Sequence, residues 1–264
     1  MKKKIFIFTD LDGSLLHRET FNFNIIKSFI KKCHSSGIFI IPNSSKTKIE
    51  IENFLEKLGL ELPFIVENGS AIYNLYLLDR SFPKEKILSR SKEDLLKIFN
   101  ENFHDTLKAK IKLLEKMPTK EVAEILGQPL DGIRQAMDRH YTHPFIFNGS
   151  ESEKLSLIEK ALRIGINIQE GDRLLSLGDN LNKSKAMLDV LSYFNRDDIV
   201  TIGIGDNKND IEMLDSSDFP CLIRNNNFNF EGLSNKNYIF SEKEAPLGWQ
   251  EVVELVLEKI ETSG

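Results

Sequence analysis

Cysteine and long apolar runs are scarce in this chain. The only cysteines, Cys33 and Cys221, lie far apart, and no Cys or His spacing around them is typical of a zinc site. We therefore expect no disulfide framework, but two buried free thiols in a reducing, cytoplasmic compartment. Every uninterrupted apolar run is far shorter than the roughly 20 residues that cross a bilayer, and the basic start at Met1 precedes only a brief apolar stretch. We expect neither a membrane span nor a signal peptide.

An excess of positive charge is also missing. The chain has 35 Lys and Arg residues against 40 Asp and Glu residues, which gives a formal net charge of −5. A nucleic-acid partner is therefore not expected, because such binding relies on a basic surface. The short apolar runs give no reason to expect a membrane partner either. With 41% hydrophobic and 28% charged residues in 264, the composition is that of a globular protein with one large domain or two smaller ones. The expected ligand is a small molecule.

Apolar strands and amphipathic helices alternate at the start of the chain. A β-prone run at residues 5–8 is followed by helical spacing over 23–36 and by a second strand-like run at 38–41. A helix over 46–58 and a short third strand at 64–66 repeat the pattern. This alternation predicts an α/β fold, a doubly wound, Rossmann-like parallel sheet with helices on both faces.

The pattern changes between residues 82 and 177. Helical segments near 92–103 and 119–126 are followed by β-type and turn residues around 139–149. This change of rhythm indicates an inserted α/β cap domain at residues 82–177.

The first pattern then resumes. A helix is predicted over 183–194, a strand over 199–204 and a terminal helix over 247–260. The Asn-rich stretch at 225–229 is interpreted as a surface loop. The predicted catalytic core consists of residues 1–81 and 178–264.

Two acidic motifs follow strands of the predicted core. The run DLDGS begins at Asp10, and the run GDNKND ends at Asp210. Open parallel sheets bind ligands at the carboxyl ends of their strands. A single motif of this kind can simply form a turn in which the Asp side chains cap their own backbone. Together, the two motifs bring four carboxylates to strand ends of one sheet, those of Asp10, Asp12, Asp206 and Asp210. These groups would repel one another without a counter-ion, and a hard cation such as Mg²⁺ relieves that repulsion.

The two motifs, in this order, resemble those of the haloacid dehalogenase superfamily of phosphohydrolases. The resemblance implies that Asp10 is a nucleophile that forms an aspartyl-phosphate and that Asp12 is the general acid and base. The chemistry agrees, because a carboxylate can attack phosphorus and a second carboxyl can protonate the leaving alcohol and then activate water. The resemblance also implies Mg²⁺ bound by the Asp10 carboxylate, the Asp12 main-chain carbonyl and Asp206, with Asp210 more remote.

The superfamily further uses a Ser or Thr after the second strand and a Lys at the start of a late helix. Ser44 is predicted to donate a hydrogen bond to the phosphoryl group, with Ser45 as the alternative, although a serine here is also an ordinary helix N-cap. Lys183 fits the expected K-x-x-A register better than Lys185 and is predicted to steady the nucleophile and phosphate. The alternative for either lysine is a solvated helix face.

The insert resembles the large cap of one branch of the superfamily, and within it the chain is similar to the mannosyl-3-phosphoglycerate phosphatases. The similarity covers nearly the whole chain. It is carried by the runs TDLDGSLL, SSKT, PFIVENGSAI, RHYTHPF and APLGW, which begin at Thr9, Ser44, Pro63, Arg139 and Ala245. It implies hydrolysis of mannosyl- or glucosyl-3-phosphoglycerate to the glycosylglycerate and phosphate.

The cap run contributes candidate substrate-binding residues. Arg139 can bind a carboxylate through a bidentate fork, which suits a phosphoglycerate, or be an exposed Arg without a specific contact. Asn68 either lines the pocket floor or belongs to a tight turn. His143 stands where the family usually has an acidic residue, and packing is its expected role. Ser184 follows Lys183 where the family usually has Gly, and these departures leave the identity of the sugar open.

Two other functions remain as alternatives. One is a different sugar phosphatase, such as one acting on sucrose phosphate. The other is a catalytically silent module that senses a phosphorylated metabolite. The joint presence of Asp10, Asp12 and Lys183 argues against a silent protein.

Overall fold

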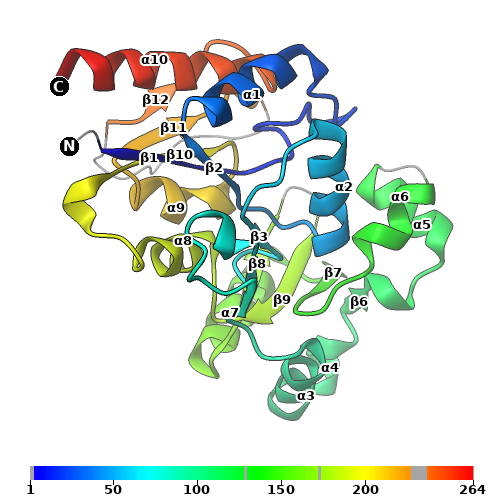
Figure 1. The fold of residues 1–264 in the computed structure, drawn as a ribbon. Coiled ribbons are helices and arrows are strands. Elements are labelled where there is room, and N and C mark those ends of the chain that lie inside the picture. Colours follow the sequence, from blue (N-terminus) through cyan, green and yellow to red (C-terminus); the bar gives the residue numbers. More distant parts are fainter. Residues whose placement is uncertain (1–2, 128–129, 172–173, 227–236, 264) are drawn as a thin grey trace.

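The protein is described by a computed structural model that covers residues 3–127, 130–171, 174–226 and 237–263. Within these residues, a five-stranded parallel sheet forms the centre of the fold, in the order β12-β11-β10-β1-β2 (Figure 1). Its strands are β1 (Lys4–Thr9), β2 (Phe39–Pro42), β10 (Ile199–Gly205), β11 (Phe219–Leu222) and β12 (Ile239–Phe240). Because β1 pairs with β10 in parallel, the two acidic motifs follow adjacent strands at the same edge of the sheet.

The side chains of the central sheet point into two apolar layers. In β1, Ile7 packs into one layer, whereas Phe6 and Phe8 pack into the other, since successive side chains of a strand face opposite sides. The first layer is covered by α1 (Lys27–Ser35), α2 (Lys48–Leu58) and α10 (Leu247–Ser263), and the second by α8 (Lys183–Leu191) and α9 (Ile211–Asp215). Helices on both faces confirm the predicted doubly wound α/β fold.

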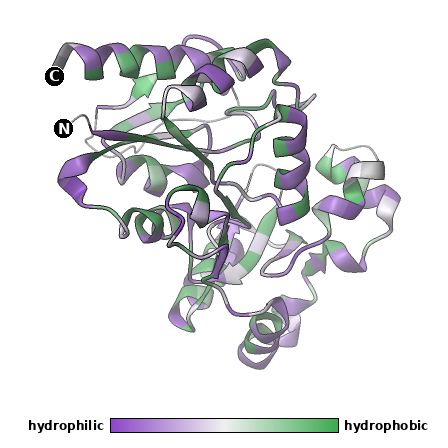
Figure 2. Cartoon of the chain, in the orientation of Figure 1, coloured by the Kyte–Doolittle hydropathy of each residue, from purple (hydrophilic) through white to green (hydrophobic). Residues whose placement is uncertain are grey.

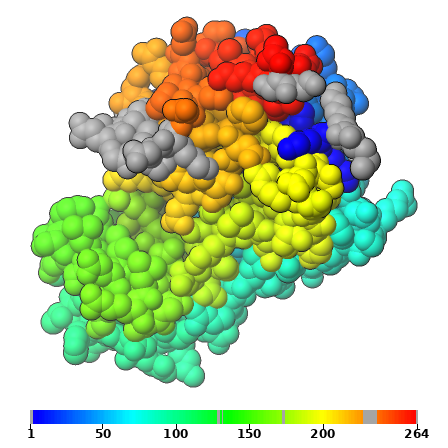
Figure 3. Space-filling model, turned by 90° about the vertical axis from the view of Figure 1, so that its left-hand side faces the viewer, coloured from blue at the N-terminus to red at the C-terminus, as the bar shows by residue number. Residues whose placement is uncertain are grey.

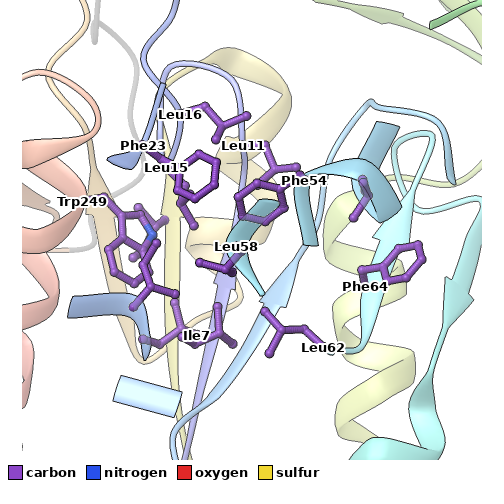
Figure 4. Close-up of a cluster of buried hydrophobic side chains, with 14 of the residues drawn as sticks. Ile7, Leu11, Leu15, Leu16, Phe23, Phe54, Leu58, Leu62, Phe64 and Trp249 are labelled. Atoms are coloured by element: carbon purple, nitrogen blue, oxygen red, sulfur yellow. The ribbon is translucent and has the colours of Figure 1, made fainter. Parts of the chain in front are cut away.

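The first layer gathers residues from distant parts of the chain. Figure 4 shows Trp249 of α10 and Phe54 and Leu58 of α2 around Ile7. Helices α2 and α10 are banded purple and green in Figure 2, because hydrophilic and apolar residues alternate along them. Burial of their apolar side therefore fixes these helices against the sheet.

The third predicted strand does not join the central sheet. β3 (Phe64–Val66) pairs antiparallel with β4 (Ala71–Tyr73), which pairs with β5 (Glu85–Ile87). An isolated bridge between Asn43 and Ile65 connects β3 to the chain beyond β2. The antiparallel pairing of β3 with β4 follows from the turn at residues 67–69, whose positive φ angles reverse the chain directly after β3.

A third sheet lies beside the core and is a four-stranded antiparallel sheet, in the order β6-β7-β9-β8 among the described residues. Its strands are β6 (Ile111–Leu113), β7 (His143–Phe147), β8 (Ile166–Glu170) and β9 (Leu175–Asp179). The surrounding helices are α3 (Lys92–Asn102), α4 (Asp105–Lys108), α5 (Thr119–Leu126), α6 (Leu130–Ala136) and α7 (Glu151–Arg163). Figure 3 shows this green segment gathered below the yellow-to-red residues of the core.

This second unit has an apolar core of its own, to which Phe99, Phe145 and Leu157 contribute. An α/β cap is thereby confirmed, while its limits at residues 82 and 177 stay a prediction. Short 3₁₀ helices complete the described structure: η1 (Asn24–Ile26), η2 (Leu75–Leu77), η3 (Leu114–Lys116), η4 (Arg196–Asp198) and η5 (Lys208–Asp210).

Both cysteines are buried and unpaired, which confirms the predicted free thiols. Burial raises the pKa of the Cys33 thiol to about 11 and that of Cys221 to about 12, so both are protonated at neutral pH. Among the described helices, none combines the length and apolar character needed to cross a membrane.

Candidate active site

Asp10 lies at the carboxyl end of β1 and is only 6% exposed. Its backbone N–H donates to Ile204 O at 2.8 Å, which fixes it against β10. Trp249 Nε1 donates to Thr9 Oγ1 at 3.0 Å, and Thr9 Oγ1 donates to Asp10 O at 2.7 Å. The strand pair and α10 therefore hold the backbone of the candidate nucleophile in place.

Lys183 is the cation nearest to this carboxylate among the described ion pairs. Its Nζ lies 2.6 Å from Asp10 Oδ1 and 2.7 Å from Asp210 Oδ1, and the residue is 1% exposed. Burial opposes its charge, but attraction to both carboxylates raises the pKa of Lys183 above its ordinary value. The other candidate, Lys185, donates instead to Asn180.

Three buried carboxylates form a cluster that can hold a metal ion. Oxygen atoms of Asp10, Asp206 and Asp210 all lie within 4.8 Å of one another. Burial raises the pKa of Asp10 to about 6, Lys183 opposes this shift, and the charges of Asp210 and Asp12 add to it. Burial and the charges of Asp10 and Asp210 likewise hold the pKa of Asp206 well above its usual range. A hard divalent cation fits this donor set, because it would compensate the crowded negative charge.

Asp206 is oriented by Ser14 of the first acidic motif, by Arg18 shortly after it and by Asn225 from a distant segment. Ser14 Oγ donates to its Oδ1 at 3.1 Å, Asn225 Nδ2 donates to its Oδ2 at 3.0 Å, and Arg18 Nη2 also contacts Oδ2. Gly13 has a φ of +81°, and a Cβ there would lie 2.6 Å from Asp206 Oδ2. Because Gly13 has no Cβ, the Asp206 carboxylate of the second motif can lie this close to the backbone of the first motif.

Asn225 was missed by the sequence analysis, which placed it in a surface loop. It is 7% exposed, and its side chain donates to Asp206 O as well as to the carboxylate. Residues 227–229 of that predicted loop lie outside the described residues. A signal was available in the apolar run at residues 219–223, which ends just before Asn225 and whose first four residues form β11.

Asp210 holds the loop after β10 together. Its Oδ2 accepts hydrogen bonds from Asp206 N at 3.0 Å and Asn207 N at 3.1 Å, while its Oδ1 binds Lys183. It therefore fixes the backbone of Asp206 and the ammonium group of Lys183 at the same time.

Asp12 lines the same cleft as Asp10 and contacts Lys46. Asp12 Oδ2 is 2.8 Å from Lys46 Nζ, and Asp12 Oδ1 is buried without a hydrogen-bond partner among the described residues. Lys46 was not singled out from the sequence, although it belongs to the SSKT run. A signal was available, because a cation directly before the amino end of a helix is electrostatically unfavourable unless other groups compensate it.

The two candidate serines differ in exposure. Ser44 follows β2, is 1% exposed, and accepts a hydrogen bond from Lys46 N at 3.3 Å through its Oγ. Ser45 lines the cleft described below. The N-cap of α2 is Thr47, which forms a capping box with Glu50. The alternative that one of these serines caps the helix is therefore wrong.

Arg139 connects the cap with the core. Its Nε donates to Ala136 O at 3.0 Å, and its Nη1 donates to Ser45 O at 3.1 Å and to Thr142 Oγ1 at 3.0 Å. It also lines the cleft. The alternative of an exposed Arg without specific contacts is thereby excluded.

The turn after β3 binds the same cap segment. The Glu67 carboxylate accepts hydrogen bonds from His140 N at 2.9 Å, Tyr141 N at 3.2 Å and Thr142 Oγ1 at 2.6 Å. Asn68 has a φ of +59° and lines the cleft, so it belongs both to a tight turn and to the pocket wall. Sequence reasoning missed the role of Glu67, because its partners lie more than seventy positions further along the chain.

His143 lies inside the cap, as expected for a packing role. It is 2% exposed, its Nε2 is 2.8 Å from Lys92 O, and its Nδ1 is 3.3 Å from Glu115 Oε2.

A cleft between core and cap contains the carboxylates of Asp10, Asp12 and Asp206. On the core side it is also lined by Arg18, Phe21, Ser45, Lys46, Glu50, Asn68, Asn207 and Asn209. On the cap side it is lined by Leu126, Ala136, Arg139, Pro144, Gln169, Glu170, Gly171, Leu174 and Ser176. The buried Oγ of Ser176 has no hydrogen-bond partner among the described residues. The arrangement places the candidate nucleophile in the same cleft as a cap wall of mixed polar and apolar residues, which can contact the rest of a substrate.

Comparison with known proteins agrees with this geometry. The profile of the haloacid dehalogenase-like hydrolases matches residues 7–235. A glucosyl-3-phosphoglycerate/mannosyl-3-phosphoglycerate phosphatase from Persephonella marina is 33% identical over 266 residues, covering 97% of this chain and 98% of the relative. A mannosyl-3-phosphoglycerate phosphatase from Pyrococcus furiosus is 31% identical over 227 residues, covering 82% and 90%. The solved sucrose-phosphatase of Synechocystis sp. shares the fold, with a TM-score of 0.62 over 99% of both chains at 13% identity.

Proposed function

The chain belongs to the haloacid dehalogenase-like hydrolases, and we propose that it is a magnesium-dependent phosphatase that converts glucosyl- or mannosyl-3-phosphoglycerate to the glycosylglycerate. The observation that carries the chemistry is the contact of Lys183 Nζ with Asp10 Oδ1, 2.6 Å, inside a cluster of three buried carboxylates. The substrate class rests on relatives named as phosphatases of these compounds, which align with most of this chain. A cytoplasmic location is part of the proposal.

Asp10 is the proposed nucleophile. Lys183 binds its Oδ1, and attack by the other carboxylate oxygen on phosphorus forms an Asp10–phosphate bond while the ester P–O bond breaks. Lys183 also balances negative charge that would otherwise repel the phosphate. Ser44, with Ser45 as the alternative, donates a hydrogen bond to a phosphoryl oxygen.

Asp12 is the proposed general acid and base. It gives a proton to the leaving oxygen as the ester bond breaks. In the second step it takes a proton from water, whose oxygen bonds to phosphorus as the Asp10–phosphate bond breaks, which restores both side chains. Its side chain lines the cleft and is 38% exposed, which suits contact with both a leaving group and water.

Magnesium is the proposed cofactor. The Asp10 and Asp206 carboxylates and the Asp12 carbonyl would bind it, with Asp210 fixing the loop that carries Asp206. When bound, such an ion neutralises phosphoryl oxygens and aligns the phosphate for in-line attack.

The alternative functions receive less support. The likeness to the sucrose-phosphatase is limited to the fold at 13% identity. A silent sensor does not need the buried contact between Lys183 and Asp10. Burial of these two charged groups costs desolvation free energy, and a catalytic role explains why the contact is present nevertheless.

A substrate panel tests the proposal. Phosphate release would be measured with glucosyl- and mannosyl-3-phosphoglycerate, sucrose phosphate and simple hexose phosphates. We expect the two phosphoglycerates to have the highest kcat/KM, activity to disappear with EDTA and to return with Mg²⁺, and Ca²⁺ to inhibit because its larger coordination shell misplaces the carboxylates. Full activity after exhaustive EDTA treatment would exclude the metal-dependent mechanism, and a preference for sucrose phosphate would exclude the substrate class.

A further inference from the structure

Lys46 places a buried cation next to the proposed general acid. Its side chain is 10% exposed, and its Nζ lies 2.8 Å from Asp12 Oδ2, 3.5 Å from Glu50 Oε1 and 4.9 Å from the centre of the Phe21 ring. The carboxylates of Asp12 and Glu50 beside it compensate the charge of its ammonium group. Lys46 also lines the cleft. A charged donor is therefore available to a bound ligand at this point.

The geometry of the leaving group brings a second negative charge to the same place. Asp12 must contact the ester oxygen that it protonates. In a 3-phosphoglycerate this oxygen is bonded to C3, and a single carbon atom separates C3 from the carboxylate at C1. A cation in contact with Asp12 is consequently within reach of that carboxylate.

Protein groups also engage the other cations near the site, Arg18 and Arg139 in the cleft and Lys183 beside Asp10. Lys183 binds two carboxylates at 2.6 and 2.7 Å, and Arg18 contacts Asp206. Arg139 uses Nε and Nη1 for two backbone carbonyls and Thr142. The ammonium group of Lys46 has three donors, and its contact with Glu50 is long.

We propose that Lys46 binds the carboxylate of the glycerate leaving group and thereby selects phosphoglycerates over esters of uncharged alcohols. This inference rests on the proposed function and names a specificity determinant within the same site. The Phe21 ring and the Glu50 carboxylate restrain the ammonium group, so the charge is positioned before the substrate arrives.

A matched pair of substrates tests the inference. Glucosyl-3-phosphoglycerate and glucosylglycerol 3-phosphate differ in that a hydroxymethyl group replaces the carboxylate. In wild-type protein we expect a higher kcat/KM for the acid. In Lys46→Met the ratio of the two kcat/KM values should fall roughly tenfold to a hundredfold, as a charge-assisted hydrogen bond is lost. Lys48→Met is the matched control, because Lys48 is 42% exposed and pairs with Glu52, and its ratio should stay at the wild-type value.

Two further variants extend the test. Lys46→Gln removes the charge while keeping a hydrogen-bond donor, and it replaces Lys46→Met if that variant does not fold. Lys46→Arg keeps the charge and should retain a preference for the acid. A loss of preference in both uncharged variants, together with its retention in Lys46→Arg, supports carboxylate binding.

Other outcomes overturn the inference. If Lys46→Met lowered kcat/KM equally for both substrates, Lys46 would act only by positioning Asp12. If the ratio of the two kcat/KM values were unchanged in Lys46→Met but reduced in Arg139→Ala, Arg139 would be the residue that binds the carboxylate. Equal use of both substrates by wild-type protein would overturn the inference while leaving the phosphatase proposal intact. Failure of wild-type protein to hydrolyse glucosyl- or mannosyl-3-phosphoglycerate would instead reject the proposed function.

Discussion

The carboxylate of Asp10 meets two opposing requirements. It must be ionised to attack phosphorus, yet burial raises its pKa to about 6. Lys183 favours the ionised form, whereas the neighbouring charges of Asp210 and Asp12 oppose it. The reactivity of this side chain therefore depends on the cations around it. Replacement of one carboxylate oxygen by an amide nitrogen can abolish catalysis while the fold is retained.

We expect Asp10→Asn to lower kcat by roughly three orders of magnitude or more, since an amide cannot form the acyl phosphate. The amide oxygen can still accept a hydrogen bond from Lys183, so the circular dichroism spectrum should match that of the wild type. Asp105→Asn is the control, because this side chain of the cap is 96% exposed. Appreciable turnover by Asp10→Asn would contradict a covalent intermediate.

The turn after β3 connects three parts of the protein within a few residues. Glu67 binds the cap segment, Asn68 lines the cleft, and Gly69 packs against the start of α8. All have positive φ angles, which permit the tight reversal of the chain. Substitutions in this turn should therefore affect the catalytic site through distant elements.

Gly69→Ala should destabilise the protein more than Gly37→Ala. Both glycines have a positive φ, but a Cβ at position 69 would lie 2.3 Å from Asn182 O, whereas position 37 has open space around it. We expect about 1 kcal/mol for Gly37→Ala and about 3 kcal/mol or more for Gly69→Ala, measured by urea unfolding. Gly69→Ala should also lower kcat, because Asn182 directly precedes Lys183. Equal destabilisation of the two variants would rule out the packing constraint.

Glu67→Gln should weaken the connection between core and cap. The Glu67 carboxylate accepts from two backbone N–H groups and from Thr142, and an amide would direct its own NH₂ group toward one of these donors. We expect the free energy of unfolding to fall by about 1 to 3 kcal/mol, and KM to rise because the cap wall is displaced. The exposed Glu61 supplies the control variant Glu61→Gln. Wild-type stability and KM in Glu67→Gln would contradict this role.

Across the protein, the cluster of carboxylates makes stability depend on pH and metal. In metal-free protein Asp10 keeps its proton up to about pH 6, against 3.8 as its ordinary value. Between pH 3.8 and about pH 6 the folded state therefore binds more protons than the unfolded state. The contribution of Asp10 to the free energy of unfolding accordingly falls as pH rises through this range, by on the order of 3 kcal/mol. The raised pKa of Asp206 acts in the same direction.

Bound Mg²⁺ should reverse this effect, because it favours the ionised carboxylates. We therefore expect the stabilisation by saturating Mg²⁺ to grow between pH 4 and pH 6.5 and to be smallest at the acidic end. Thermal or urea unfolding with Mg²⁺ and with EDTA at each pH measures the difference. A stabilisation that is independent of pH would mean that these carboxylates are not the metal ligands.

Much of the architecture could be read from local patterns. The helix at Thr119–Leu126 has the predicted bounds, and β1 and β10 lie where apolar runs end in acidic motifs. Such features depend on the spacing of neighbouring side chains, which a linear chain displays directly. Asp10 and Asp12 could be named as the candidate nucleophile and general acid because their short motif resembles that of the haloacid dehalogenase superfamily.

Other features arise only when distant segments pack together. The contacts of Lys46 with Asp12, of Asn225 with Asp206 and of Glu67 with the cap join residues that no local pattern relates. The antiparallel pairing of β3 with β4 also depends on the reversal of the chain at residues 67–69. The sequence specifies which side chains are available for chemistry. The packing of β1 against β10 and of the cap against the core decides which charged groups face one another. The tertiary structure decides this because Coulomb energies and hydrogen bonds depend on distance in space.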